Sequence, residues 1–217
     1  TFTTHKTLGG PRGAVIITHK PDLGRKLDRG VFPGEQGGPH MHAITALAVA
    51  FKLAKTEQFR SLQAQTVSNA MHLAACLAQH DIRLVYGGTN THLLVADCRP
   101  FTAADGTSLS GDMAARLLDL AGITCNRNTI PGDDTAARPS GIRLGTPWVT
   151  QRGFREPQIE RLAAIIAAVL RAAKPFSYDG KSGKADARAK IDYPALHEAR
   201  RAVAELSEAA GVDYSLP

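Results

Sequence analysis

Short apolar runs typical of buried strands alternate along this chain with stretches of helical periodicity, and this alternation limits its fold class more than any other feature. The strand candidates are residues 14–18, 83–86, 92–97 and 140–144. The helix candidates are residues 41–53, 59–77, 110–122, 157–170 and 194–206. Residues 21–30 and 180–189 are expected to be connections, the second one basic and flexible. Strands that alternate with helices predict an α/β protein, with a domain boundary near residue 55.

The composition limits the class of protein further. A chain of 217 residues has room for one large domain or two modest ones. Hydrophobic residues make up 43% and charged residues 21%, as in globular proteins, and no apolar run approaches the length of a membrane span. The three cysteines are widely spaced and form no CxxC pair, so we expect reduced thiols in a cytoplasmic protein, with neither disulfides nor a metal site.

The net charge of +6 raises the question of nucleic-acid binding. The basic residues are scattered, however, and aromatic residues make up only 6% of the chain, so no stacking platform is expected. We therefore expect no nucleic-acid partner, and anionic small ligands explain the charge more simply.

A single lysine lies among threonines in residues 3–13, with a histidine before it and a glycine-rich turn after it. An amine forms a Schiff base only when unprotonated, and burial or a nearby cation lowers its pKa toward that state. Arg12 could supply the cation beside Lys6. The alternative is an ordinary surface lysine, which composition alone favours.

Two glycines, Gly37 and Gly38, precede a helix candidate. Paired glycines in this position leave backbone N–H groups free to bind a phosphate. The alternative is a plain loop in which Pro39 begins the helix, and the residues alone do not decide between the two.

Polar side chains also stand out in two later stretches. Arg143 is flanked by apolar residues in a strand candidate, where it needs a partner: either a structural carboxylate or the carboxylate of a ligand, which its planar group can bind through two parallel hydrogen bonds. Asn128 lies in residues 122–131, where asparagine is also a common turn residue.

Four motifs in this order resemble the serine hydroxymethyltransferase family, a group of fold-type I enzymes that depend on pyridoxal 5′-phosphate. They are residues 3–13, 36–39, 122–131 and 140–147. The resemblance extends from residue 1 to about residue 170. It implies that residues 1–55 are the C-terminal end of the cofactor-binding large domain. Residues 56–217 would be a small C-terminal α/β domain with a short sheet packed by helices.

The resemblance also implies roles at the cofactor. Lys6 would carry pyridoxal 5′-phosphate covalently, with His5 and Thr3 beside it. Gly37 and Gly38 would reach the cofactor phosphate of a second subunit, so an obligate homodimer with shared active sites is expected, possibly paired into a dimer of dimers.

On the substrate side, the resemblance implies that Arg143 binds the carboxylate of the amino acid and that Asn128 helps to bind tetrahydrofolate, the cosubstrate. The reaction would be the interconversion of serine and glycine, with tetrahydrofolate as the one-carbon carrier. Several parts of the family's site have no counterpart here, so we expect a C-terminal part of a longer enzyme, inactive alone, that exposes apolar surface on residues 14–18 and the helix from Met41.

Departures from the family pattern leave two alternatives open. Residues 90–93 and 136–138 differ from the usual sequence, and a folate-independent threonine aldolase or transaldolase of the same family would keep Lys6 and Arg143 while losing the folate contacts. A basic scaffold that has lost catalysis and binds RNA or protein is the other alternative. The intact motif around Lys6, together with Arg143, argues against the scaffold, because a scaffold needs neither.

Overall fold

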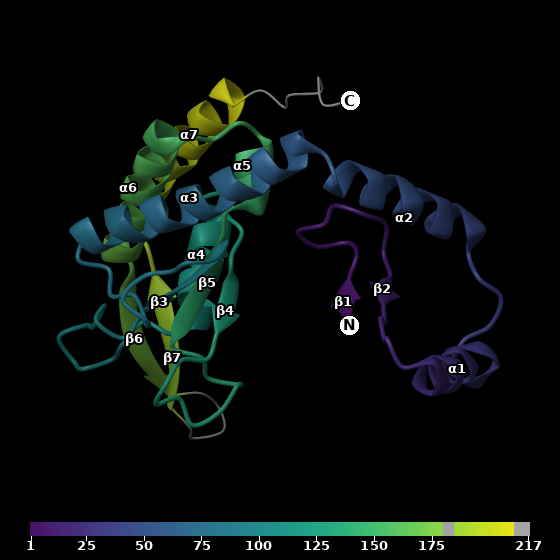
Figure 1. Cartoon of the computed structure of the whole chain (residues 1–217). Coiled ribbons are helices and arrows are strands. Elements are labelled where there is room, and N and C mark those ends of the chain that lie inside the picture. Colours follow the sequence, from purple (N-terminus) through teal and green to yellow (C-terminus); the bar gives the residue numbers. More distant parts are fainter. Residues whose placement is uncertain (180–184, 211–217) are drawn as a thin grey trace. The chain divides into compact units, whose positions relative to one another are not determined.

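The computed structural model describes residues 1–179 and 185–210, and the chain divides into two compact units, Thr1–Ser61 and Leu62–Pro217 (Figure 1). The elements of the first unit are β1 (Phe2–Thr3), β2 (Ala14–Val15), α1 (Pro21–Arg29), the irregular turn η1 (Gly30–Glu35) and α2 (Met41–Ala54). Helix α3 (Glu57–Gln79) begins at the end of this unit and continues into the second. The identity of the units as parts of a large and a small domain stays a prediction.

In the first unit, a short hairpin packs against α2. Strands β1 and β2 are antiparallel, with Phe2 opposite Val15. The Phe2 ring meets the Phe51 ring of α2 edge to face, with 6.3 Å between the ring centroids. A Cβ at Gly10 would lie 3.2 Å from the Cβ of Ala50, the buried residue of α2. The hairpin loop and α2 are therefore in direct contact.

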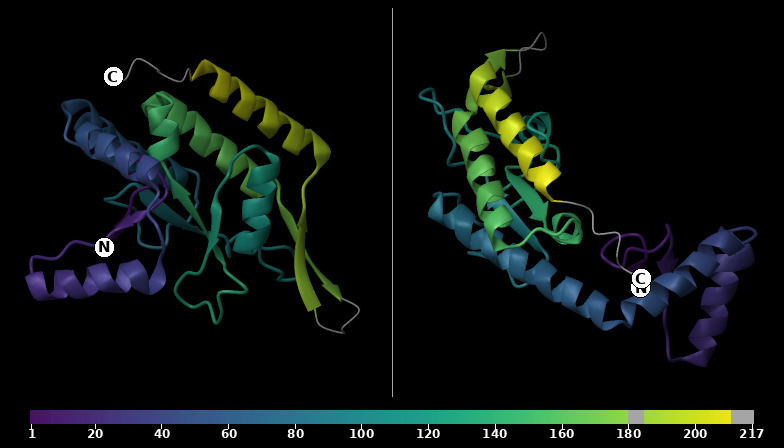
Figure 2. Two further views of the ribbon diagram at one scale, coloured as in Figure 1. Left: turned by 90° about the vertical axis from the view of Figure 1, so that its right-hand side faces the viewer. Right: turned by 90° about the horizontal axis from the view of Figure 1, so that it is seen from above.

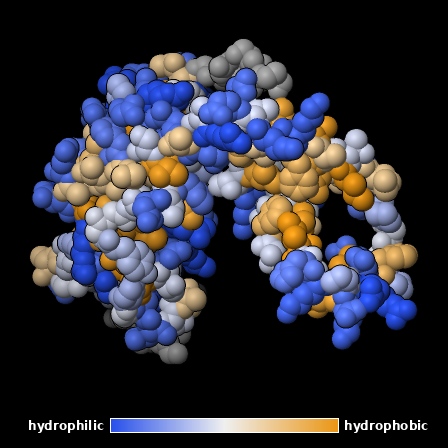
Figure 3. Space-filling view, viewed as in Figure 1, coloured by the Kyte–Doolittle hydropathy of each residue, from blue (hydrophilic) through white to orange (hydrophobic). Residues whose placement is uncertain are grey.

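Most apolar residues of this unit are exposed, as expected from the resemblance. The strand predicted for residues 14–18 is shorter than expected, since β2 ends at Val15. Ile16 and Ile17 follow it and are 48% and 73% exposed. On α2, the side chains of Ile44 and Val49 are exposed as well. Apolar side chains gather along α2 and the hairpin in the space-filling view (Figure 3).

The prediction that residues 21–30 form a connection is wrong, because Pro21–Arg29 form helix α1. Pro21 occupies the first helical position, where its fixed φ suits a helix and its missing N–H has no cost. Asp22 lies in the first turn and Arg29 in the last, so both charges interact favourably with the helix dipole and stabilise the helix. A short segment can thus be helical with only two apolar side chains, Leu23 and Leu27, which lie one turn apart.

The second unit contains most of the chain's core. After α3, its elements are β3 (Leu93–Asp97), α4 (Gly111–Leu120), β4 (Asn126–Asn128), β5 (Gly141–Gly145), α5 (Pro147–Gln151), α6 (Glu156–Ala172), β6 (Lys174–Asp179), β7 (Ala185–Lys190) and α7 (Tyr193–Ala209). The predicted helices at 59–77, 110–122, 157–170 and 194–206 are confirmed, as are the strands at 92–97 and 140–144.

A three-stranded antiparallel sheet, in the order β3-β5-β4, forms the centre of this unit. Its apolar face buries Leu94 and Ala96 of β3 and Ile142 and Leu144 of β5. Helices α3, α4 and α6 contribute the facing side chains, and α6 runs alongside α7 (Figure 2). The mixed α/β class, with a short sheet packed by helices, is confirmed.

Helix α4 is fixed at both ends by the residues that predicted it. The Ser110 hydroxyl accepts a hydrogen bond from the Met113 N–H, at 3.2 Å. Gly122 follows the helix with φ = +92°, a conformation that favours glycine. The start of the helix, Gly111, lies so close to Gly141 of β5 that no side chain fits between them.

Two predictions for this unit are wrong. Residues 83–86 form only an isolated bridge, Leu84 opposite Ala96, because the chain turns away at Gly87, which has a positive φ. Residues 185–189, expected to be flexible, belong to β7, which pairs with β6 in a hairpin. The remainder of that segment, 180–184, lies outside the described residues.

None of the helices in the described ranges, 1–179 and 185–210, is long and apolar enough to cross a membrane.

Replacing Gly111 by alanine tests the close contact between α4 and β5. The new Cβ would overlap the carbonyl oxygen of Gly141, and backbone cannot move aside easily, so we expect the free energy of unfolding to fall by about 2–3 kcal/mol. Urea titration followed by the fluorescence of Trp148, the chain's one tryptophan, measures this unit directly. The matched control is Gly145→Ala, whose Cβ meets the end of the flexible Leu93 side chain at 2.9 Å and should cost less. Equal losses for the two variants would contradict the packing described here.

Candidate functional site

The loop that carries Lys6 joins β1 to β2 and is held together by one buried threonine. The Thr4 side chain is fully buried, and its hydroxyl donates to the Pro11 carbonyl at 2.7 Å. The Thr4 N–H donates to the Gly13 carbonyl at 3.1 Å, and the Thr4 carbonyl accepts from the Gly10 N–H at 2.8 Å. A single residue thus fixes both sides of the loop.

Lys6 opens a tight turn in this loop. The Gly9 N–H donates to the Lys6 carbonyl at 2.9 Å, and Gly9 has φ = +71°. The Lys6 side chain is exposed and forms no salt bridge with a carboxylate of the described residues. An amine without a counter-ion is therefore presented by a well-held loop.

The two other predicted residues of the hairpin lie close to Lys6 in sequence but differ in surroundings. The His5 ring is half-buried, and its Nδ1 lies 3.3 Å from the carbonyl oxygen and 3.4 Å from the backbone nitrogen of Gly13. Thr3 is exposed and pairs with Ala14 at the base of the loop. The structure thus brings Thr3, His5 and Lys6 together in one hairpin.

Gly37 and Gly38 lie in the segment between η1 and α2. All of residues 28–42 are exposed within the described chain, and a Cβ at either glycine would meet nothing within 4 Å. The unit itself therefore gives no steric reason for glycine at these positions. A binding partner that approaches the backbone closely would give one.

Arg143 projects from the face of the sheet opposite the core. Because side chains alternate along a strand, Arg143 of β5 shares this face with Asn126, its partner on β4, and with Asn128, two residues further along. Its Nη2 lies 3.4 Å from the Asn126 Oδ1, a weak contact. The structure therefore places the two predicted residues, Arg143 and Asn128, on one exposed sheet face.

Asn126 is a residue of this face that sequence reasoning missed. The motif that pointed to Asn128 also contains Asn126, and the two-residue spacing of a strand would have placed both on one side. The sequence did not predict a strand here, because β4 has only three residues and no apolar pattern.

A buried carboxylate next to this sheet was also missed. Asp97 is 1% exposed and accepts two hydrogen bonds from the Arg99 Nε, at 3.0 and 3.2 Å, and one from its Nη2, at 2.8 Å. Arg83 adds a salt bridge of 3.2 Å. Burial alone would raise the pKa of Asp97, but the hydrogen bonds and charges of the two arginines outweigh it, and the pKa is lowered.

The Asp97 cluster extends to the loop between β4 and β5. The Asp133 carboxylate accepts from the Ile130 and Ser140 N–H groups, each at 2.9 Å. Burial would raise the pKa of Asp133, but these hydrogen bonds and the charge of Arg99 lower it. The Arg99 Nη1 also donates to the Pro131 carbonyl at 3.3 Å. This network fixes the loop that follows Asn128.

The cysteines and possible metal ligands add nothing to these sites. Burial raises the pKa of the Cys98 thiol to about 12 and that of Cys125 to about 11, so neither is a nucleophile at neutral pH. Among the residues that the structure describes, no three His, Cys, Asp or Glu side chains form a group that could hold a metal ion.

Comparison with known proteins identifies similar chains. The family model for serine hydroxymethyltransferase matches residues 1–166. A serine hydroxymethyltransferase of Caenorhabditis briggsae is 41% identical over 96% of this chain and 42% of its own length. One from Rickettsia canadensis (strain McKiel) is 47% identical over 78% of this chain and 39% of its own length. The chain thus spans about two fifths of the length of these curated relatives.

Replacing Asp97 by asparagine tests the buried cluster through its pH dependence. The lowered pKa means that the carboxylate stabilises the fold fully above its unfolded value of about 3.9 and loses this effect as the pH falls through the folded value. We expect Asp97→Asn to lower the free energy of unfolding by about 1–3 kcal/mol at pH 7 and by less at pH 3.5. Urea titrations at both values measure the difference.

The matched control is Asp134→Asn, since Asp134 is an exposed carboxylate in the loop between β4 and β5. It should change stability little at either pH. A loss in Asp97→Asn that increased as the pH fell would show that the carboxylate is not stabilised by the two arginines.

Proposed function

The chain belongs to the serine hydroxymethyltransferase family, and we propose that it contributes the cofactor lysine and the substrate arginine to an enzyme that interconverts serine and glycine, with tetrahydrofolate as the one-carbon carrier. This family consists of transferases that share the two motifs around Lys6 and Arg143. The remaining parts of such a site would come from residues outside these 217.

The surroundings of Arg143 are the observation that carries the proposal. Its guanidinium is exposed, and no carboxylate of the described residues forms a salt bridge with it. The neighbouring strand residue, Arg127, differs because its Nη1 binds Asp112 at 2.8 Å. A structural ion pair therefore does not explain Arg143. A planar guanidinium with free donors suits the carboxylate of an amino acid, which accepts two parallel hydrogen bonds.

Asn128 supports a second ligand on the same face. Its Nδ2 donates to the Thr129 carbonyl at 2.7 Å, which orients the amide and leaves the Oδ1 as an acceptor. Folate carries N–H donors that such an oxygen can bind. We propose that Asn128 contacts tetrahydrofolate near the carboxylate site of Arg143.

The residues around Lys6 fit pyridoxal 5′-phosphate. The exposed amine has no counter-ion, and the loop that presents it is fixed by the buried Thr4. When bound, the cofactor would act as an electron sink for the substrate's reacting carbon. The ring of His5, tied to the backbone of Gly13, would hold the loop in place, and the exposed Thr3 would contact the cofactor beside it.

The exposed segment 28–42 supports a shared active site. Backbone N–H groups at Gly37 and Gly38 could bind the cofactor phosphate of a second subunit, and open space around both glycines allows the close approach that this needs. We propose a homodimer on this basis. We also propose a cytoplasmic location for the assembled enzyme.

Arg143→Lys tests the proposed substrate role in an enzyme of the relatives' full length that carries these residues. Lysine keeps the charge but loses the planar fork, so we expect the affinity for serine to fall by roughly one to two powers of ten, or about 1.5–3 kcal/mol. Serine binding is measured by titration of the cofactor's absorbance. Because Lys6 is unchanged, the absorbance of the bound cofactor should remain.

The matched control is Arg127→Lys, on the neighbouring strand, which keeps a charge beside Asp112 and should bind serine normally. If Arg143→Lys bound serine normally but lost the cofactor or unfolded, Arg143 would be structural and the proposal would fail.

A further inference from the structure

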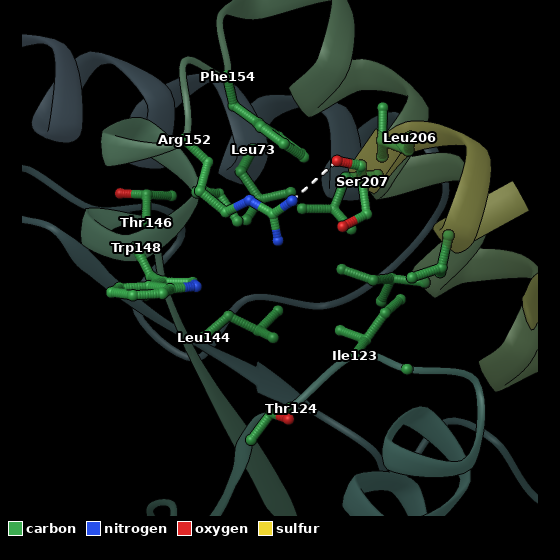
Figure 4. Close-up of a pocket in the computed structure, with 16 residues that line it drawn as sticks. Leu73, Ile123, Thr124, Leu144, Thr146, Trp148, Arg152, Phe154, Leu206 and Ser207 are labelled. Atoms are coloured by element: carbon green, nitrogen blue, oxygen red, sulfur yellow. Dashed lines mark hydrogen bonds between the residues drawn. The ribbon is translucent and has the colours of Figure 1, made fainter. Parts of the chain in front are cut away.

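A cavity of about 290 Å³ lies in the second unit, between the end of β5 and helices α5, α6 and α7 (Figure 4). Most of its wall is apolar and belongs to the edge of the hydrophobic core; the main contributors are Leu73, Ile123, Leu144, Phe154, Leu162 and Leu206. Leu144 points to the face of the sheet opposite Arg143, because the two are neighbours in β5. None of the residues that line the cavity takes part in the proposed function.

One charged side chain, Arg152, lines this apolar cavity. Its Nη2 donates to the Ser207 carbonyl at 2.8 Å, as Figure 4 shows. Its Nε is buried and has no hydrogen-bond partner. No carboxylate of the described residues forms a salt bridge with the guanidinium. Arg152 as a whole is half-buried, and a cation whose buried Nε lacks a hydrogen bond next to apolar walls is costly unless an anion joins it.

The position of Arg152 is fixed by local structure. It follows the short helix α5, where its N–H donates to the Trp148 carbonyl at 3.2 Å. Trp148 is 71% exposed and also lines the cavity (Figure 4). The lining of the cavity thus combines a mostly apolar wall, one cation and one indole ring.

We propose that this cavity binds a small amphipathic monocarboxylate, with its carboxylate on Arg152 and its apolar part between Leu144, Ile123 and Leu206. A modest turn of the guanidinium toward the cavity would give the ligand two parallel hydrogen bonds and satisfy Nε. An inorganic anion would leave the apolar walls unfilled, and a neutral apolar molecule would leave the cation unpaired. A volume of this size suits an apolar body of about six carbons.

The ligand test uses hexanoate and the 217-residue chain. Trp148 is the chain's one tryptophan and lines the cavity, so its fluorescence reports binding at this site. We expect a saturable change in emission with hexanoate. Because a charge-assisted hydrogen bond is lost, 1-hexanol should need a roughly ten- to hundred-fold higher concentration, and acetate and inorganic phosphate should not saturate. No saturation by hexanoate, or equal affinity for 1-hexanol or phosphate, would overturn the proposal.

Two variants separate the cation from the cavity. Arg152→Gln should weaken hexanoate binding by roughly ten- to hundred-fold, whereas Arg200→Gln, an exposed arginine on α7, should not. Val203→Phe keeps Arg152 but fills the cavity that Val203 lines, and should also abolish binding. Circular dichroism verifies that each variant is folded, and if Arg152→Gln is not, Val203→Phe decides. Unchanged affinity in either folded variant would refute the site.

Discussion

The alternation of side chains along β5 is the constraint on which the second unit depends. Ile142 and Leu144 enter the core, so Arg143 between them must lie on the opposite face. Burial of two large aliphatic side chains is worth several kcal/mol, far more than the weak contact of Arg143 with Asn126. The core therefore fixes the register, and the register presents the guanidinium without a carboxylate partner. The packing of the core and the proposed substrate contact therefore depend on the same strand.

In the first unit, the loop that carries Lys6 depends on the buried residue Thr4, through its hydroxyl and its backbone. Its hydrogen bonds close the loop in which Lys6 lies, and the packing of that loop on Ala50 holds it against α2. The long exposed stretch of residues 28–42 and the exposed isoleucines after β2 have no such support within the unit. Surface of this kind suits contacts with the remaining parts of a larger enzyme, as proposed for the shared active site.

Much of this could be predicted from the sequence, because long helices and the strands of the core carry periodic apolar patterns. The helices at 59–77 and 157–170, and the strand that contains Arg143, are examples. Elements with a short or absent apolar pattern could not be predicted: α1 has only two apolar residues, Leu23 and Leu27, and β7 depends on its partner strand. The site showed the same limit. Motifs pointed to Lys6 and Arg143, but the contacts of Arg143 with Asn126 and of Asp97 with Arg83 depend on how the strands and loops come together in the fold.

The central claim is that Lys6 carries the cofactor. In an enzyme of the relatives' full length assembled with pyridoxal 5′-phosphate, borohydride reduction makes the cofactor–lysine bond permanent, and peptide mass spectrometry then locates it. We expect the adduct on Lys6, with Lys20, the next lysine along the chain, unmodified. An adduct on Lys20 or on any other lysine, with Lys6 unmodified, would contradict it.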